Sequence, residues 1–385
     1  MTDPSDRKDQ LEVLWLDPLA PETPLGQWQD LADNSVDPNP FFAPGYLQPF
    51  LRAFPSATIR LLVIREKGSK IWRMTAPIGR RRAGLAVPVK TTWTSYYAPL
   101  GTPLLRDIGG ADDVAAFVKA GAGSSSLMAM PFLPSNSRVA SLAGEITGWE
   151  SRWAGKLARA GHSSGNLGEI QYKTAMSRKR RKEMRRQLRR LEDHGPIRTA
   201  HLLGEEALKG FEDFLKLEAK GWKGRAGTAL SSSEETASFS RHVIKNRSLN
   251  NGVRIDQLWA GETLISSLII FIVVSHVFSW KIAFNETFAR VSPGAQIAAI
   301  SMKQNLQSPD ILEADSLAVP GHSMIEPLWR GRVEFGTLIL SRGTLGTSLA
   351  SLAAADLKLE HSVRSKARTL KAFLASDPSG RLGNK

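Results

Sequence analysis

Apolar positions in the first part of the chain form short runs that predict strands, separated by a segment with helical spacing. The runs at 59–64, 71–78 and 84–89 are bounded by turn residues, as is typical of strands. Apolar residues at 111–120 have helical spacing, and the run at 127–132 predicts a buried strand. We therefore expect a mixed unit of helices and strands here.

A Gly- and Ser-rich segment at 156–172 predicts the junction to a second part of the chain. Beyond several amphipathic helices, the runs at 253–259, 263–273 and 277–284 predict three consecutive strands joined by tight turns. The triplet Ser-Pro-Gly at 292–294 then predicts a helix start, because Ser caps helix N-termini and Pro suits the first helical position.

Toward the C-terminus the pattern predicts one more strand at 310–318, a helix beginning near His322, and a long Ala-, Leu- and Ser-rich helix. Two segments also echo one another: residues 59–78 and residues 253–272 each read as a strand, a Gly-containing turn and a strand. Their identity is low, so two unrelated hairpins would explain the echo equally well. A true repeat would make the chain two copies of one module.

The amino-acid composition excludes several classes of chemistry for this chain. The 385 residues suit two or three domains, and 42% hydrophobic with 23% charged residues is typical of a globular protein. With no cysteine, thiol nucleophiles, Cys-ligated metals and disulfides are excluded, and the seven histidines show no metal-binding spacing, so no metal is expected. The polar N-terminus is unlike a signal peptide, and the longest apolar run, 264–274, is too short to span a membrane. We therefore expect a cytoplasmic protein.

The net charge of +14 predicts attraction to an anionic partner. Its largest single source is the segment Arg178–Arg190, in which nine of thirteen residues are basic. Met184, Leu188 and Leu191 would give this helix one narrow apolar face. Three interpretations of the cationic remainder stay open: a solvated face, a tRNA-binding surface, or attachment to the anionic inner face of the membrane.

Four segments of the second part, taken in order, resemble a known family. They are LEAKGWKGRAGTAL (217–230), DQLWAGETLISSLIIF (256–271), SWKIAFNETFARVSPG (279–294) and EADSLAVPGHSMIEPLWRGR (313–332). Over about residues 171–335 the chain resembles GNAT-type acetyltransferases of the CelD/BcsL group, named for an association with cellulose synthesis. That group is similar in architecture to the Fem-type transferases, which consist of two tandem GNAT modules.

The resemblance implies an α/β (α+β) fold of two tandem GNAT-like modules, with mixed, mainly antiparallel sheets flanked by helices. The modules would span 1–170 and 171–375, followed by a disordered tail at 376–385. In such a module two neighbouring strands splay apart to admit acyl-CoA, and a helix N-terminus binds its pyrophosphate. The resemblance therefore implies acetyl-CoA as acyl donor.

The donor-binding residues expected at the helix start are Arg290, Ser292 and Gly294. Lys281 is also expected to bind the donor, because a Lys between apolar strand neighbours points to an anion or to solvent; acceptor binding and a solvent-facing position stay open for it. Two features depart from the family pattern. Arg290 stands four residues before Gly294, where the usual phosphate loop has a spacing of three, and Asn285 occupies a position where the group has Asp. An Asp at that position therefore cannot be the catalytic group in this chain.

Three residues are candidates for the catalytic base. Asp315 and His322 could form a carboxylate–imidazole pair that deprotonates an acceptor hydroxyl or amine, and Glu218 could line the acceptor cleft. Ordinary helix capping and surface ion pairing would account for the same residues. The expected acceptor-binding residues are Trp222, Lys223, Glu326 and Arg330; the last two would share a helical face with His322.

The sequence thus predicts an acyltransferase that moves an acetyl group directly from acetyl-CoA to a hydroxyl or amine of a carbohydrate-type or polysaccharide acceptor. Two alternatives stay open at this point. One is aminoacyl transfer from tRNA, as in Fem-type enzymes. The other is a degenerate, non-catalytic GNAT protein that accompanies a membrane-bound polysaccharide synthase.

Overall fold

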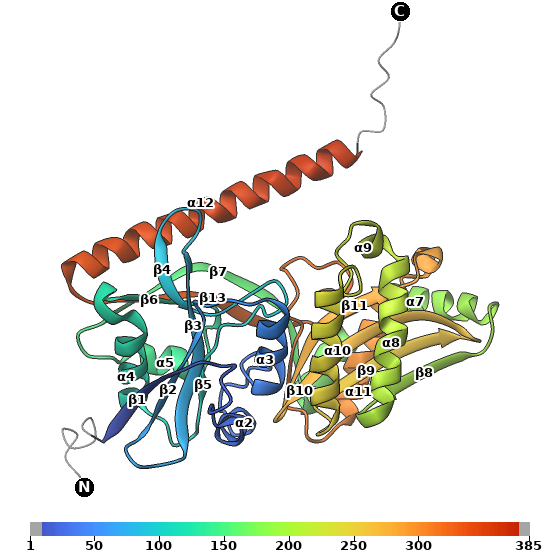
Figure 1. Cartoon of the computed structure of the whole chain (residues 1–385). Coiled ribbons are helices and arrows are strands. Elements are labelled where there is room, and N and C mark those ends of the chain that lie inside the picture. The colour runs from blue at the N-terminus through green and yellow to red at the C-terminus, as the bar shows by residue number, and fades with distance from the viewer. Residues whose placement is uncertain (1–9, 377–385) are drawn as a thin grey trace, which may run out of the picture.

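A computed structural model describes residues 10–376, with side chains placed up to residue 360 and at 362 and 363. It contains one continuous 13-stranded sheet, mostly antiparallel, with helices on its faces (Figure 1). The predicted mixed α/β fold class is confirmed. The elements of the first half are β1 (Leu11–Leu16), α2 (Leu25–Asp33), α3 (Pro44–Ala53), β2 (Arg60–Glu66), β3 (Trp72–Arg82), β4 (Pro88–Thr92), β5 (Leu104–Leu105), α4 (Ala111–Ala122), β6 (Leu127–Pro134), α5 (Arg138–Gly144) and β7 (Glu150–Ser163).

The second half begins with two helices and then follows a similar order of elements. They are α6 (Gly165–Thr174), α7 (Arg178–Glu192), β8 (Ile197–Leu202), α8 (Gly204–Lys220), α9 (Trp222–Arg225), α10 (Glu234–Ser248), β9 (Val253–Ala260), β10 (Thr263–Val273), β11 (His276–Phe284), the 3₁₀ helix η2 (Glu286–Val291), α11 (Pro293–Gln307), β12 (Glu313–Asp315), β13 (Gly331–Ser341) and α12 (Gly343–Ser376).

The two halves repeat one topology. In each, a first strand and helices precede an antiparallel meander of three strands, and a helix then leads to a strand that runs parallel to the last of the three. The parallel partners are β4 with β6 in the first half and β11 with β12 in the second. The hairpins β2–β3 and β9–β10, which carry the echo seen in the sequence, occupy equivalent places.

The halves are joined by strands exchanged at the centre of the sheet. The strand order there is β6–β13–β7–β12, so β13, from the end of the chain, lies between two strands of the first half. β7 in turn pairs with both β13 and β12. The expected junction at 156–172 is therefore not a free linker, since it forms the end of β7 and most of α6.

The last helix, α12, crosses the outside of the first half and packs on β7 and β13 (Figure 1). Its Asp356 carboxylate accepts hydrogen bonds from four consecutive backbone N–H groups, Gly84 to Val87, at 2.8–3.0 Å. These bonds, led by that of Val87, lower the pKa of Asp356 to about 2. The helix is thereby fixed to the turn between β3 and β4.

Some local expectations are corrected. No helix starts at His322; residues 323–328 form turns, and Pro327 lacks the N–H that a helix would need there. The strand expected over 310–318 is only three residues long. The predicted tail lies outside the described residues except for Ser376, which ends α12. No described helix is long and apolar enough to cross a membrane.

One buried histidine makes stability depend on pH. His162 on β7 is packed edge-on against Trp329 with 4.7 Å between ring centroids, and its ring nitrogens lie 3.0 Å from Ser163 O and Asn305 Nδ2. Burial lowers its pKa to about 4. Both nitrogens can be satisfied by a neutral ring that donates to Ser163 and accepts from Asn305.

Between an unfolded pKa of about 6.5 and the folded value, the unfolded chain binds more protons, so the free energy of unfolding falls as the pH drops through that window. We expect His162 to account for about 1–3 kcal/mol of the loss between pH 7 and pH 4.5. Denaturant unfolding of His162→Gln should show a smaller pH-dependent loss than the wild type. His242→Gln, at an exposed site on α10, is the control, and equal losses in both variants would contradict the assignment.

Candidate active site

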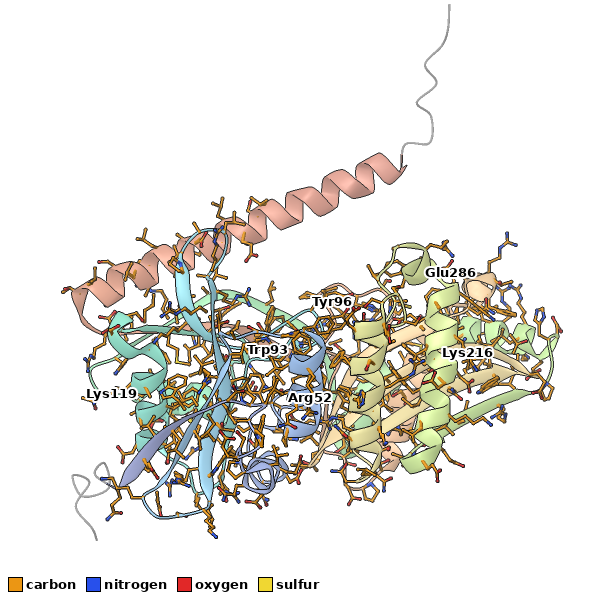
Figure 2. The ribbon with its side chains drawn as sticks, in the orientation of Figure 1. Arg52, Trp93, Tyr96, Lys119, Lys216 and Glu286 are labelled. Atoms are coloured by element: carbon orange, nitrogen blue, oxygen red, sulfur yellow. The ribbon has the colours of Figure 1, made fainter. Side chains whose placement is uncertain are left out.

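A cavity of about 1360 Å³ lies between the two halves and is lined by both. The first half contributes the loop after β4, including Tyr96, and the second half contributes β11 and the helices α8 and α9. Figure 2 shows Tyr96 near the junction of the halves and Glu286 on the same side of the second half. Five of the eleven predicted site residues line this cavity: Glu218, Trp222, Lys223, Lys281 and His322.

One wall of the cavity is a gap between two strands. β11 pairs with β12 only over His276–Phe278, although β11 continues to Phe284. Beyond Asp315 the chain leaves the sheet, and both Ser279–Phe284 and Ser316–Pro320 line the cavity. The second half of β11 therefore has an unpaired edge, as expected for a strand that receives a ligand.

Backbone groups on this edge are directed into the gap. The Ile282 carbonyl accepts a hydrogen bond from Lys223 Nζ at 2.9 Å, across the gap side of the strand. Asn285 N–H instead bonds to Ile265 O on β10. Because the N–H and C=O of one strand residue point to the same edge, the Ile282 N–H also faces the gap. It can donate to a carbonyl oxygen placed there.

A β-bulge lies next to Lys281 on β11. Ile269 and Ile270 of β10 pair with Lys281 and Ser279, which leaves Trp280 as the extra residue. Lys281 Nζ lies 4.3 Å from the centroid of the Tyr96 ring and 5.0 Å from that of Tyr97. Burial, and next the charge of Lys223, lower the Lys281 pKa to about 8.

Glu218, Lys223 and Trp222 lie together on one wall of the cavity. Glu218 is 3% exposed; its Oε1 accepts from Lys223 Nζ and its Oε2 from Leu230 N–H, both at 2.8 Å. The Trp222 N–H is bonded to Glu286 Oε1 at 2.6 Å, while its ring is 54% exposed. Glu218 thus holds the segment 221–230 against α8. The indole ring of Trp222 stays free for a ligand.

His322 lies in the loop between β12 and β13 and faces the same cavity. Burial, and next the charge of Lys223, lower its pKa. Its Nδ1 is buried and has no hydrogen-bond partner among the described residues. The ring is therefore neutral at pH 7 and can accept a proton from a bound group.

Asp315 is not paired with His322. Its two oxygens accept from Arg159 Nε and Nη2 at 2.7 and 2.6 Å, and Oδ1 also accepts from Leu317 N–H. Asp315 borders a second cavity of about 400 Å³, whereas Arg159 borders the large one. This buried ion pair thus forms part of the wall between the two cavities.

Glu326 and Arg330 lie outside the site cluster. Glu326 accepts from the Gly321 N–H and pairs with Arg332 at 2.8 Å, so it braces the loop that carries His322. Arg330 is exposed. Without a helix at 322–330 these residues do not share the face that the sequence spacing predicted.

The starts of two equivalent helices differ in their capacity for anions. At α4 the Asp113 carboxylate accepts from the Gly110 N–H and binds Arg73, so an anion of the chain itself occupies the helix start. The first turn of α11 has no acidic residue, and Ser292 makes no capping bond there. The start of α11 is therefore the one suited to an external anion.

The predicted donor residues lie around this helix start. Gly294 is buried, and a Cβ on it would lie 2.0 Å from Met324 Sδ, so a larger residue there would have to displace that flexible side chain. The Arg290 side chain is exposed, and its carbonyl accepts from Gln187 of the basic helix α7 at 3.5 Å. Lys281 lies apart from them, on the face of the sheet that carries α8.

Sequence reasoning missed several residues that shape the site. Tyr96 and Arg159 come from the first half and reach the cavity only through the tertiary fold, and Tyr97 contacts Lys281 in the same way. The Pro/Gly-rich aromatic loop that starts at Tyr96 was visible in the sequence, but nothing local indicates that it covers Lys281. Among the described residues, no group of three or more His, Asp or Glu could hold a metal ion.

Comparison with known proteins supports the class of this site. Residues 178–304 match a family model described as an acetyltransferase (GNAT) domain. Such domains typically use acyl-CoA as donor. No curated protein sequence matches the chain.

Two solved structures share the fold. The crystal structure of FemX superposes with a TM-score of 0.54 at 8% identity, covering 89% of this chain and 100% of that one. The C-terminal domain (DUF2156) of a putative lysylphosphatidylglycerol synthetase from Agrobacterium fabrum gives a TM-score of 0.51 at 12% identity, covering 86% and 95%. The chain thus carries a GNAT-type acetyltransferase domain and is an acyltransferase.

The contacts of Glu218 predict that its replacement destabilises the protein more than the replacement of an exposed glutamate on the same helix. Replacing Glu218 by Ala leaves Lys223 without its acid and Leu230 N–H without an acceptor, so the free energy of unfolding should fall by about 3 kcal/mol. Glu212→Ala, on the same helix α8, removes only an exposed ion pair with Arg241 of α10. It should lower the free energy of unfolding by less than about 1 kcal/mol. Urea unfolding of both variants measures this, and similar losses would show that Glu218 does not hold the 221–230 segment.

Proposed function

We propose that this protein transfers an acetyl group from acetyl-CoA directly to an amine or hydroxyl of a carbohydrate-type acceptor, as an enzyme of the polysaccharide-associated group that its sequence resembles. The observation that carries the proposal is the gap between β11 and β12, which opens into the large cavity. The start of α11 has no acidic residue, and Met324, which covers Gly294 there, also lines that cavity. Backbone donors and an anion site are what a phosphate-bearing thioester requires.

The two halves then take different roles, as modules 1–170 and 171–375. The donor belongs to the second module, because the start of α4 in the first is filled by Asp113 while the first turn of α11 has no acidic residue. Arg290, Ser292 and Gly294 would hold its pyrophosphate. The first module contributes the aromatic loop at Tyr96, on the side from which an acceptor would enter.

The chain's own residues supply the remaining steps. Acetyl-CoA brings an activated thioester. The Ile282 N–H donates to its carbonyl oxygen and stabilises the charge that develops as the acceptor attacks. His322 accepts the proton that the acceptor loses, the bond from carbon to sulfur breaks, and the proton passes on to the thiolate of CoA. Glu218 positions Lys223, and Asp315 positions Arg159.

Binding of the donor is the first test. Calorimetric titration with acetyl-CoA should give a dissociation constant in the micromolar range, and free CoA should bind with similar strength because the phosphates provide most contacts. Gly294→Val should abolish binding of both, since its side chain would occupy the helix start. Folded protein that does not bind acetyl-CoA but binds tRNA would refute this proposal and favour aminoacyl transfer.

The role of His322 predicts a pH profile. With its pKa below the usual 6.5, His322 stays neutral into mildly acidic solution, so turnover should fall only at a pH lower than that at which a free imidazole titrates. His322→Gln should lower kcat by about 100-fold or more and remove that acidic limb. His242→Gln should change neither. Asp315→Asn should keep the limb, because Asp315 contacts Arg159 rather than the imidazole; loss of the limb in this variant instead would make Asp315 the base.

A further inference from the structure

One charge in the cavity lacks a counter-charge. The Lys281 ammonium lies between β11 and the aromatic loop of the first half, over the rings of Tyr96 and Tyr97. No carboxylate among the described residues forms an ion pair with it. Two other cations that line the cavity have their acids, since Lys223 pairs with Glu218 and Arg159 with Asp315. Arg80 also lines it but is exposed to water, whereas Lys281 is partly buried.

The acids nearest in the fold are already engaged. Both oxygens of Glu218 accept hydrogen bonds, from Lys223 and from the Leu230 N–H. Both oxygens of Glu286 do so as well, from the Trp222 N–H and Arg225. Neither carboxylate can turn to Lys281 without breaking a buried or charge-assisted contact. The missing negative charge is therefore not available from this wall of the cavity.

A cation removed from water is costly unless another charge or a π-face compensates it. The two tyrosine rings supply part of that compensation through their negative faces. The rings also orient the ammonium, and the protein does not use all three of its N–H donors. Such a cation, inside a cavity that receives a substrate, is suited to bind an anionic group of that substrate.

Aromatic rings border the same space. Tyr96 is 72% exposed and Trp222 is 54% exposed, and both line the cavity, one from each half of the chain. Large exposed aromatic side chains at a cavity present flat apolar faces to a ligand, and the faces of a sugar ring offer a matching C–H surface. The site thus combines ring-stacking surfaces with one unneutralised cation.

We infer that the acceptor is an acidic saccharide, whose ring stacks on Tyr96 or Trp222 and whose carboxylate or phosphate binds Lys281. This inference rests on the proposed function for the location of the acceptor. Its test, however, uses equilibrium binding and requires no turnover.

The experiment compares three sugars that share one ring: glucose, glucuronic acid and glucose 6-phosphate. Each is titrated into the full-length protein in 150 mM salt, and binding is followed by tryptophan fluorescence and calorimetry. We expect one or both acidic sugars to bind about tenfold more tightly than glucose, as a charge-assisted contact in a partly enclosed site would give. Comparison of the two acids distinguishes carboxylate from phosphate as the recognised group.

Variants assign the effect to Lys281. Lys281→Met should reduce the affinity for the preferred acid to that for glucose, and Lys281→Arg should keep most of the preference. Tyr96→Ala should weaken the binding of neutral and acidic sugars by the same factor. Lys216→Met, on the outer face of α8 (Figure 2), is the matched control for the loss of one positive charge and should change nothing.

Inorganic phosphate separates recognition of the sugar from simple anion binding by the basic helix α7. It should bind weakly and equally to wild type and Lys281→Met. Equal binding of all three sugars, no binding of any of them, or an acid preference that survives Lys281→Met would overturn the inference. Acetyl-CoA titration of the same samples tests the proposed function separately, so donor binding without acid preference refutes only the inference.

Discussion

The antiparallel pairing of β7 with β13 is the contact on which the rest of the molecule depends. It runs from Glu150 to Gly161 on one strand and from Gly331 to Ser341 on the other, and each strand has a further partner on its far side. Because of this pairing, the backbone ladder continues without a break from β1 to β8. The two halves are therefore fixed relative to one another by main-chain hydrogen bonds, and also by a shared side-chain core in which Tyr46 of α3 packs on Phe239 of α10.

The site takes its shape from that central pair. Arg159 projects from β7 with its guanidinium 4.5 Å from the centroid of the Phe335 ring on β13, and both side chains line the large cavity. The strand gap of the second half and the aromatic loop of the first both border this cavity, and they meet where Lys281 contacts Tyr96. A repeated module thus produces one cavity with two unlike walls, since only one of the two helix starts is free of an internal carboxylate.

Local patterns in the sequence predicted the elements that carry their own signal. The runs read as strands at 253–259, 263–273 and 277–284 correspond to β9, β10 and β11, and the Ser-Pro start of α11 is where capping chemistry placed it. The two central strands were missed. β7 is largely polar and exposed at its start, and both β7 and β13 contain glycines, so neither shows a clean alternation.

In the candidate site, too, contacts between residues close in sequence were predictable and contacts between distant segments were not. Glu218, Trp222 and Lys223 are close in sequence, and the structure keeps them together. The pairing of Asp315 with His322 failed to appear because a distant residue, Arg159, takes the carboxylate across the sheet. The contact of Lys281 with Tyr96 likewise joins segments from different halves. Contacts of this kind depend on the exchange of strands, which no local window of sequence contains.

The exchanged strand also sets the order in which the chain can fold during synthesis. β6 and β7 leave the ribosome early, but the place between them stays open until β13 has been made, after almost all of the second half. Until then, two strand edges near the centre of the first half have unpaired N–H and C=O groups, which invite pairing with other chains. The nascent first half is therefore the aggregation-prone species of this protein, and release of the C-terminal region from the ribosome is the event that protects it.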